Sequence, residues 1–231
     1  MNKLFKLLTC FSFFLSLSPY ASAGIVITGT RIIYPSNERE VMVKLNNTGS
    51  KPVLMQAWID DGDSTKGPDS AEAPFTITPP VNRIDPQKGQ TLKIAFTGEN
   101  SPEDKESVFW LNVLEIPPQS TSEENNLQMA FRTRIKLFYR PSGLEGKSYE
   151  ATDKITWKRE GDGVTGYNDS AYYISLAAIA ADADGKKIIS ESGMIPPKEK
   201  KHFKLSELPE KIYPVYINDY GANKITPSIV N

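Results

Sequence analysis

The chain has 231 residues, and its 27 basic and 28 acidic residues give a formal net charge of −1 at pH 7. This length suits one large or two ordinary domains, and the charge balance offers no basic surplus for a nucleic-acid partner. One cysteine, Cys10, and one histidine, His202, exclude a disulfide framework and a histidine-rich metal site, and no cofactor is expected.

The first 23 residues have the pattern of a secretory signal peptide. Two lysines lie near the start, an apolar stretch follows from Leu7 to about Leu17, and Ala21–Ala23 supplies small residues for a signal peptidase. The apolar stretch is too short to span a bilayer comfortably, so we expect cleavage and no membrane insertion. The mature chain would begin at Gly24 without any cysteine, and packing alone would have to hold it together.

Beyond Gly24, apolar side chains alternate with polar ones at a period of two, which places them on opposite faces of β-strands. The alternation is clearest at Val41–Leu45, Val53–Ile59 and Leu92–Phe96. Turn-forming residues separate these runs, as at Asn47–Gly49, Asp61–Asp63 and Pro79-Pro80. Many short strands and no long amphipathic helix predict an all-β fold of antiparallel sandwiches.

The segment Pro141–Lys147 has the composition of a linker, with one proline and two glycines. We therefore predict two sandwiches, at about 24–141 and 147–231. Shorter strands are expected in the second, at Lys154–Lys158, Tyr172–Ala180, Lys187–Ser190, His202–Leu205 and Tyr213–Ile217. The basic run Lys198–Lys204 fits a solvated loop better than a binding patch.

The segment from Asn126 to Arg140 is long for a strand, whose usual length is about 5–6 residues. Its residues Leu127, Met129 and Phe131 share one face. Composition leaves two interpretations open. The segment is either an ordinary strand that packs on its own core, or an edge strand that pairs with a partner and fills the partner's pockets.

Two cations stand out near these apolar runs. Arg31 lies within Gly24–Tyr34, an apolar run expected to form one strand at the start of the first domain, and Lys136 lies within the long segment. A cation in an apolar strand must reach water, a carboxylate or a partner. Each alone is more often an outward surface charge, whereas a neighbouring pair could clamp a chain-terminal carboxylate. The sequence does not show whether the two are neighbours.

Several ordered blocks resemble the periplasmic pilus-assembly chaperones, the PapD-like family. These blocks are Gln56–Ile59, Ala73–Gly89, Leu114–Pro118, Ile135–Pro141 and Tyr216–Gly221. The resemblance implies two immunoglobulin-like domains in a boomerang arrangement and a periplasmic location. It implies a chaperone, not an enzyme, that captures pilus or fimbrial subunits by donor-strand complementation and delivers them to an outer-membrane usher.

The same resemblance assigns roles to individual residues. Arg31 and Lys136 take the positions that bind the subunit's C-terminal carboxylate. The donor positions, whose side chains enter the subunit's groove, are Leu127, Met129 and Phe131. A slip of one residue would turn every donor side chain the wrong way, so a carboxylate fixed at the cations would set the register.

Glu106, Arg140 and Asp219 match a charged trio that links the two domains in the family. A buried trio of this kind would fix the interdomain angle more than it adds stability. The short stretch Pro118–Asn126 resembles the subgroup with a short loop before the donor strand. The exposed apolar row also gives a physical reason to expect the free chaperone to form a self-capping homodimer.

Two other classes of protein fit the sequence less well. A secreted adhesin or a structural pilus component is the alternative, but a pilus subunit would be expected to have one incomplete domain and a free N-terminal extension. For an enzyme, His202 among lysines is more typical of a surface residue than of a general base. Asp60–Asp63 lacks the later ligands of a calcium-binding EF-hand loop, so a turn is predicted there.

Overall fold

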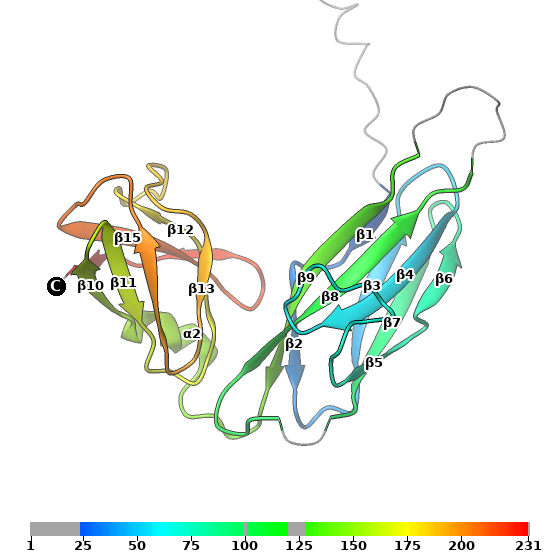
Figure 1. Ribbon diagram of the computed structural model, residues 1–231, viewed down its shortest axis with the longest axis horizontal. Helices are drawn as coiled ribbons and strands as arrows, with labels where there is room; N and C mark the ends of the chain where they lie inside the picture. The colour runs from blue at the N-terminus through cyan, green and yellow to red at the C-terminus, as the bar shows by residue number, and fades with distance from the viewer. Residues whose placement is uncertain (1–23, 99–100, 120–127, 231) are drawn as a thin grey trace, which may run out of the picture.

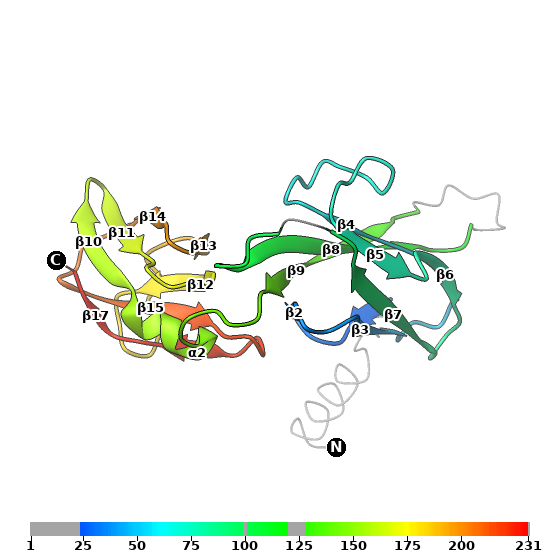
Figure 2. The ribbon, with the colours of Figure 1, turned by 90° about the horizontal axis from the view of Figure 1, so that it is seen from below.

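The computed structural model describes residues 24–98, 101–119 and 128–230 (Figure 1). The predicted signal peptide and Leu127 lie outside these residues. Two β-sandwich domains follow one another along the chain and are set at an angle, as Figures 1 and 2 show from two directions. The predicted all-β fold with two domains in a bent arrangement is confirmed.

Nine strands of the described chain form the first domain. They are β1 (Ile25–Ile27), β2 (Arg31–Pro35), β3 (Val41–Asn47), β4 (Val53–Asp60), β5 (Phe75–Thr78), β6 (Val81–Ile84), β7 (Gly89–Phe96), β8 (Ser107–Ile116) and β9 (Phe131–Arg140). One sheet has the order β1-β3-β7-β5, and the facing sheet has the order β2-β9-β8-β4-β6. The sandwich therefore places β9 between β8, the strand that precedes it in the chain, and β2, a strand from the start of the domain.

The alternation predicted from the sequence matches the burial in this domain. In β3, Val43 and Leu45 are buried while Met42 and Lys44 are exposed. The inward-facing rows of both sheets meet in one core that includes Leu45, Leu92, Leu111 and Leu137. Each such leucine contributes roughly 1.5–3 kcal/mol when it leaves water, which makes this core the main support of the sheet that carries β9.

The single strand expected across Gly24–Tyr34 is two strands. β1 pairs antiparallel with β3 in one sheet, whereas β2 pairs parallel with β9 in the other. Gly29, between them, has a φ of +98°, a backbone conformation that glycine adopts without a steric penalty. The chain crosses between the sheets at this point, and the crossing makes Arg31 the register partner of Lys136.

The second domain begins with a short helix and is otherwise built of strands. Its elements are α2 (Ser148–Ala151), the 3-10 turn η1 (Thr152–Lys154), β10 (Thr156–Glu160), β11 (Gly163–Tyr167), β12 (Ile174–Ala180), β13 (Gly193–Ile195), β14 (Lys200–Lys204), β15 (Lys211–Ile217), β16 (Asn223–Ile225) and β17 (Ser228–Ile229). The sheets have the orders β10-β11-β14 and β13-β12-β15-β16, and β17 also pairs with β15. In the described part of the chain, no helix has the length and apolar character needed to cross a bilayer.

Three predictions for this domain were wrong in detail. The strand expected at Lys187–Ser190 is reduced to one bridge, between Ile188 and Ala180. β11 and β13 were missed because both contain glycine, which weakens the pattern of a strand. The basic run expected to be a loop is largely β14, although its lysine side chains are exposed as expected.

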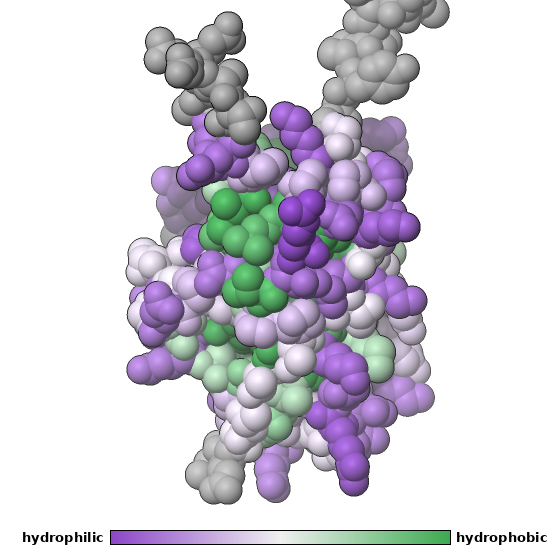
Figure 3. Space-filling view, turned by 90° about the vertical axis from the view of Figure 1, so that its right-hand side faces the viewer, coloured by the Kyte–Doolittle hydropathy of each residue, from purple (hydrophilic) through white to green (hydrophobic). Residues whose placement is uncertain are grey.

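An exposed apolar patch lies on the first domain, away from β9. Figure 3 shows hydrophobic side chains gathered on the side of the molecule that carries β6. Leu54 of β4 and Val81 of β6 are two exposed large apolar residues of this domain. The strands pair with Gln56 opposite Val81, so both apolar side chains share one face of the sheet.

Candidate functional site

β9 is paired on both edges only in its second half. β8 pairs with it from Phe131 to Tyr139, whereas β2 pairs only with Lys136–Arg140. Among the described residues, no strand pairs with the other edge of Phe131–Ile135, and we call this segment the free edge. Its unpaired backbone N–H and C=O groups are a template for a further strand.

The core-facing side chains of β9 change character along the strand. Leu137 and Tyr139 are buried in the core of their own domain, and Ile135 packs against that core from a half-buried position. Phe131 is 59% exposed, and Met129, just before the strand, is 53% exposed. The ordinary-strand interpretation thus describes the second half of β9, whereas Phe131 of the free edge and Met129 just before it are left largely in water.

Arg31 and Lys136 are register partners on β2 and β9. The Arg31 Nη1 donates a hydrogen bond to the Ile217 carbonyl oxygen of the second domain at 3.2 Å. Its Nε is buried and has no hydrogen-bond partner within the described residues. The Lys136 Nζ lies 5.5 Å from the centroid of the Trp110 ring. The structure therefore brings both predicted cations together at the junction of the domains.

Both cations lie in surroundings that disfavour their charge. Burial lowers the pKa of Arg31, and the field of Asp219 only partly opposes this. Burial also lowers the pKa of Lys136, and the positive charges of Arg31 and then Lys201 lower it further. An anion bound between the two side chains would relieve both effects, so the pair has the electrostatics of an anion site.

Lys201 is a neighbour that the sequence analysis did not assign to this site. It belongs to β14 of the second domain, and its Nζ lies 3.3 Å from where a Cβ on Gly193 would stand. The signal in the sequence was the run Lys198–Lys204, but periodicity cannot show that one of its lysines faces another domain. The positive charge of Lys201 acts on Lys136. The junction is therefore more positive than Arg31 and Lys136 alone would make it.

Arg140 binds both acidic residues of the predicted trio, Glu106 in the first domain and Asp219 in the second. The Arg140 Nε donates to Glu106 Oε1 at 2.6 Å. Its Nη1 and Nη2 donate to the two carboxylate oxygens of Asp219 at 2.8 and 3.0 Å. The Ser148 hydroxyl also donates to Asp219, at 2.8 Å. Arg140 thus joins the end of β9 to the turn after β15.

Backbone contacts tighten the same junction. The amide of Glu106 donates to the Ala171 carbonyl at 2.9 Å, and the Tyr173 amide donates to Glu106 Oε2 at 2.8 Å. Gly221 stands so close to Thr30 that an added Cβ would lie 2.5 Å from the threonine Oγ1. Burial raises the pKa of Glu106 against the field of Arg140. Burial also acts to raise the pKa of Asp219, but the hydrogen bonds and charge of Arg140, together with the Ser148 hydrogen bond and the charge of Arg31, lower it overall.

Replacing Arg140 with alanine is expected to destabilise the protein by about 3 kcal/mol, because Glu106 would stay buried without its cation. Urea unfolding followed by tryptophan fluorescence would measure the loss, and small-angle scattering would report the angle between the domains. The pair of changes Glu106→Gln and Arg140→Met should cost less stability, since the charge of the fully buried Glu106 is removed together with its cation and Asp219 keeps partial access to water. An Arg140→Ala protein with unchanged stability and scattering would contradict this role for the trio.

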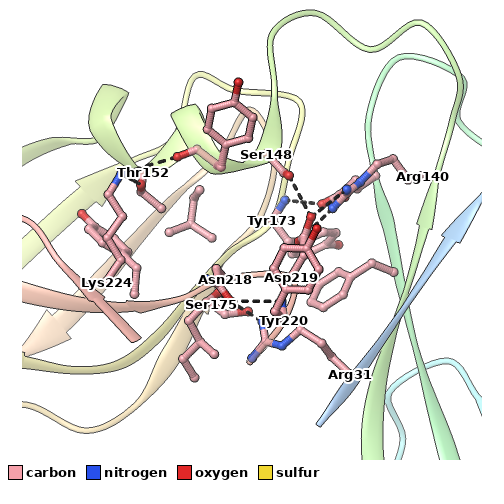
Figure 4. Close-up of a pocket in the computed structure, with 16 residues that line it drawn as sticks. Arg31, Arg140, Ser148, Thr152, Tyr173, Ser175, Asn218, Asp219, Tyr220 and Lys224 are labelled. Atoms are coloured by element: carbon pink, nitrogen blue, oxygen red, sulfur yellow. Dashed lines mark hydrogen bonds and ion pairs between the residues drawn. The ribbon is translucent and has the colours of Figure 1, made fainter. Parts of the chain in front are cut away.

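A cavity of about 510 Å³ lies between the domains beside Arg31 (Figure 4). Asp219, Tyr220 and Lys224 line it from the second domain, and Tyr220 is almost fully exposed at its rim. Lys136 is not one of the residues that line the cavity, and its ammonium lies near Trp110. Among the described residues, no cluster of three or more His, Cys, Asp or Glu residues could hold a metal ion.

Comparison with known proteins gives matches to both domains. The family described as "Pili and flagellar-assembly chaperone, PapD N-terminal domain" matches residues 24–145. The family described as "Pili assembly chaperone PapD, C-terminal domain" matches residues 150–227.

Whole-length relatives agree with these matches. The chaperone protein FimB/FhaD of Bordetella pertussis is 44% identical over 220 residues, which are 92% of this chain and 89% of the relative. The probable fimbrial chaperone YadV of Escherichia coli is 42% identical over 227 residues, 92% of each chain. The crystal structure of the Pseudomonas aeruginosa CupB2 chaperone covers 89% of this chain and 100% of its own, with 36% identity and a TM-score of 0.77. The chain belongs to the PapD-like family of pilus-assembly chaperones.

Proposed function

We propose that this chaperone captures fimbrial or pilus subunits in the periplasm by pairing the free edge of β9 with a subunit sheet that lacks a strand. The observation that carries the proposal is the half-paired state of β9, with Met129 and Phe131 exposed beside unpaired backbone groups. An isolated edge of this kind is an aggregation hazard that proteins normally suppress. Its retention favours use in strand addition.

Strand addition would satisfy both partners. The subunit's groove would bury the side chains of Met129 and Phe131, each gaining roughly 1.5–3 kcal/mol, and its backbone would pair with the free edge. We propose Leu127 as the third donor residue, because its position continues the same alternation. Leu137 and Tyr139, on the same face of β9, would then connect the chaperone's core with the subunit's groove.

Arg31 and Lys136 are proposed to bind the subunit's terminal carboxylate. Their adjacent register positions, their half-buried surroundings and their lowered pKa values support this role. A carboxylate held there would fix which side chain of β9 meets which pocket of the subunit. A subunit that docked one residue out of register would present the wrong face to Phe131.

The remaining parts of the proposal follow the family. Residues 1–23 would be removed on export, the domains would comprise 24–141 and 147–231, and the trio around Arg140 would hold the interdomain angle. The chaperone would pass its subunit to an outer-membrane usher, and it would act without enzymatic activity or a cofactor. A free chaperone would cap its exposed row in a homodimer.

The proposal is tested by expressing the chain in a periplasm with and without single candidate subunits from neighbouring genes. A one-to-one complex that keeps the subunit soluble is expected. Size-exclusion chromatography with light scattering would measure its mass and the mass of the free chaperone. A subunit that stays soluble and unbound at the same yield without the chain would contradict the proposal.

A further inference from the structure

The outer face of the free edge carries two arginines, Arg132 and Arg134. The Arg134 Nε donates to Asp60 Oδ2 at 3.2 Å, and its Nη2 donates to Oδ1 of the same carboxylate. The Arg132 Nη2 donates to the Ser64 carbonyl oxygen at 2.8 Å. Asp60 ends β4, and Ser64 lies in the loop that follows. The free edge is thereby tied across β8 to a segment two strands away.

The Asp60 carboxylate is held in place by other hydrogen bonds besides those from Arg134. Its side chain is fully buried, and it accepts further hydrogen bonds from Asn112 Nδ2 at 2.6 Å and from the Gly62 amide at 2.8 Å. Burial opposes its ionisation, but the hydrogen bonds, led by those from Arg134, outweigh burial and lower its pKa. The carboxylate therefore stays charged and holds the guanidinium of Arg134 at one point of the sheet.

The guanidinium groups of both arginines pack over tryptophan rings of the neighbouring strands. The Arg134 Cζ lies 4.4 Å from the centroid of the Trp110 ring, and the Arg132 Cζ lies 5.9 Å from that of Trp58. Guanidinium groups pack well over aromatic faces, and the planar group keeps its hydrogen bonds while it does so. A strand with one face in water would expose every second residue, but β4 is buried on both faces from Ala57 to Asp60. The packing of the arginines over this face explains that burial.

A strand paired on one edge only opens more readily than one paired on both. Within the described parts of the chain, the free edge has β8 alone as a strand neighbour, yet it must be extended to accept a subunit. Any ordering that binding has to impose reduces both affinity and rate. The hydrogen bonds of Arg132 and Arg134 act on the face opposite Phe131, so they order the strand without occupying its apolar row.

We propose that Arg132 and Arg134 are positioning residues that hold the free edge of β9 extended before a subunit arrives. The inference rests on the proposed function, because the free edge is where the subunit is proposed to pair. It assigns a role in capture to side chains that face away from the donor row, and to the loop after β4 that anchors one of them.

Two variants test the anchor. Arg132→Ala removes one tie at the surface, and the double variant Asp60→Asn with Arg134→Gln removes the ion pair without leaving a buried charge. In the free protein, amide hydrogen exchange in peptides that cover the free edge should rise about tenfold, the effect of losing a hydrogen bond to a charged group. The association rate with a purified subunit should fall by about the same factor.

Matched control variants distinguish a local effect on the free edge from a general loss of protein stability. Arg159→Ala removes the same kind of contact in the second domain, where its guanidinium donates to the carbonyls of Leu208 and Pro209 at 3.1 and 2.7 Å. That change should leave both the exchange of the free edge and the association rate at their original values. Arg132→Lys keeps a donor for the Ser64 carbonyl and should restore much of the association rate.

Unchanged exchange at the free edge in Arg132→Ala and in the double variant would overturn the proposal. Faster exchange with an unchanged association rate would overturn it as well, since the arginines would then serve stability alone. If the double variant does not fold, Arg132→Ala decides the matter by itself. Failure of the proposed strand donation would be seen separately, because subunit capture would then survive Met129→Glu. The hydrogen-exchange test of the arginines uses the free protein and does not depend on that result.

Discussion

Arg31→Ala and Lys136→Ala should each abolish recovery of a bound subunit from the periplasm. A charge-assisted hydrogen bond to a carboxylate contributes about 1.5–3 kcal/mol, so the loss of either cation weakens binding at least about tenfold. The loss of register adds to this, because every donor side chain depends on where the carboxylate is held. Co-purification of subunits with each tagged variant measures the effect.

The fold should survive both changes. For Lys136→Ala, the direction of the change in stability can also be predicted. The pKa of Lys136 is lowered by burial and by the charges of Arg31 and Lys201. Its charged ammonium therefore destabilises the folded state of the free protein. Lys136→Ala should therefore leave the melting temperature unchanged or raise it. Lys158→Ala is the matched control, because Lys158 also lies over an aromatic ring, 5.0 Å from that of Tyr167, but in the second domain. Full recovery of subunit with Arg31→Ala would contradict the carboxylate clamp.

Met129→Glu and Phe131→Glu should block subunit stabilisation. Each would carry a carboxylate into an apolar pocket, and an unpaired buried charge costs several kcal/mol, more than the contact it replaces can supply. Both side chains are exposed in the free chaperone, so its own stability should change little. The steady-state level of soluble subunit in the periplasm, measured by quantitative blotting, reports the effect.

Two controls isolate the pocket from the added charge. Met42→Glu places the same substitution at an exposed methionine of the same domain, on β3 in the other sheet, and should have no effect. Met129→Leu keeps an apolar side chain of similar volume and should retain capture. Normal subunit levels with both glutamate variants at the donor positions would count against strand donation.

The all-β fold and the strands β3, β4 and β7 could be predicted because their sequences alternate at a period of two, which burial follows in β3 and in the first half of β4. β5, β6 and β8 were not predicted, and β8 is buried or half-buried along its whole length, so it shows no alternation of exposed and buried residues. The crossing between β1 and β2 could not, since GIVITGTRIIY reads as one apolar run and only the tertiary structure places its halves in different sheets. That crossing decides the site. It puts Arg31 beside Lys136, and it lets β2 cover only the second half of β9.

The extent of the free edge was likewise beyond the sequence. The alternation of Met129 and Phe131 continues smoothly into Leu137, so periodicity alone cannot separate exposed positions from buried ones. Lys201 and Asp60 were also missed as neighbours of β9. Lys201 acts on Lys136 through its charge from 65 positions away and across the domain junction, and Asp60 binds Arg134 from 74 positions away and across β8. No local pattern in the sequence marks pairs so far apart.

Amide hydrogen exchange of the free edge with and without a bound subunit tests the central claim most directly. Strand addition would give the unpaired backbone groups of Phe131–Ile135 new partners, so their exchange should slow strongly in the complex. The fully paired half, Lys136–Arg140, should change much less, which provides an internal reference. A stable complex in which the free edge exchanges as fast as in the free chaperone would contradict capture by strand donation.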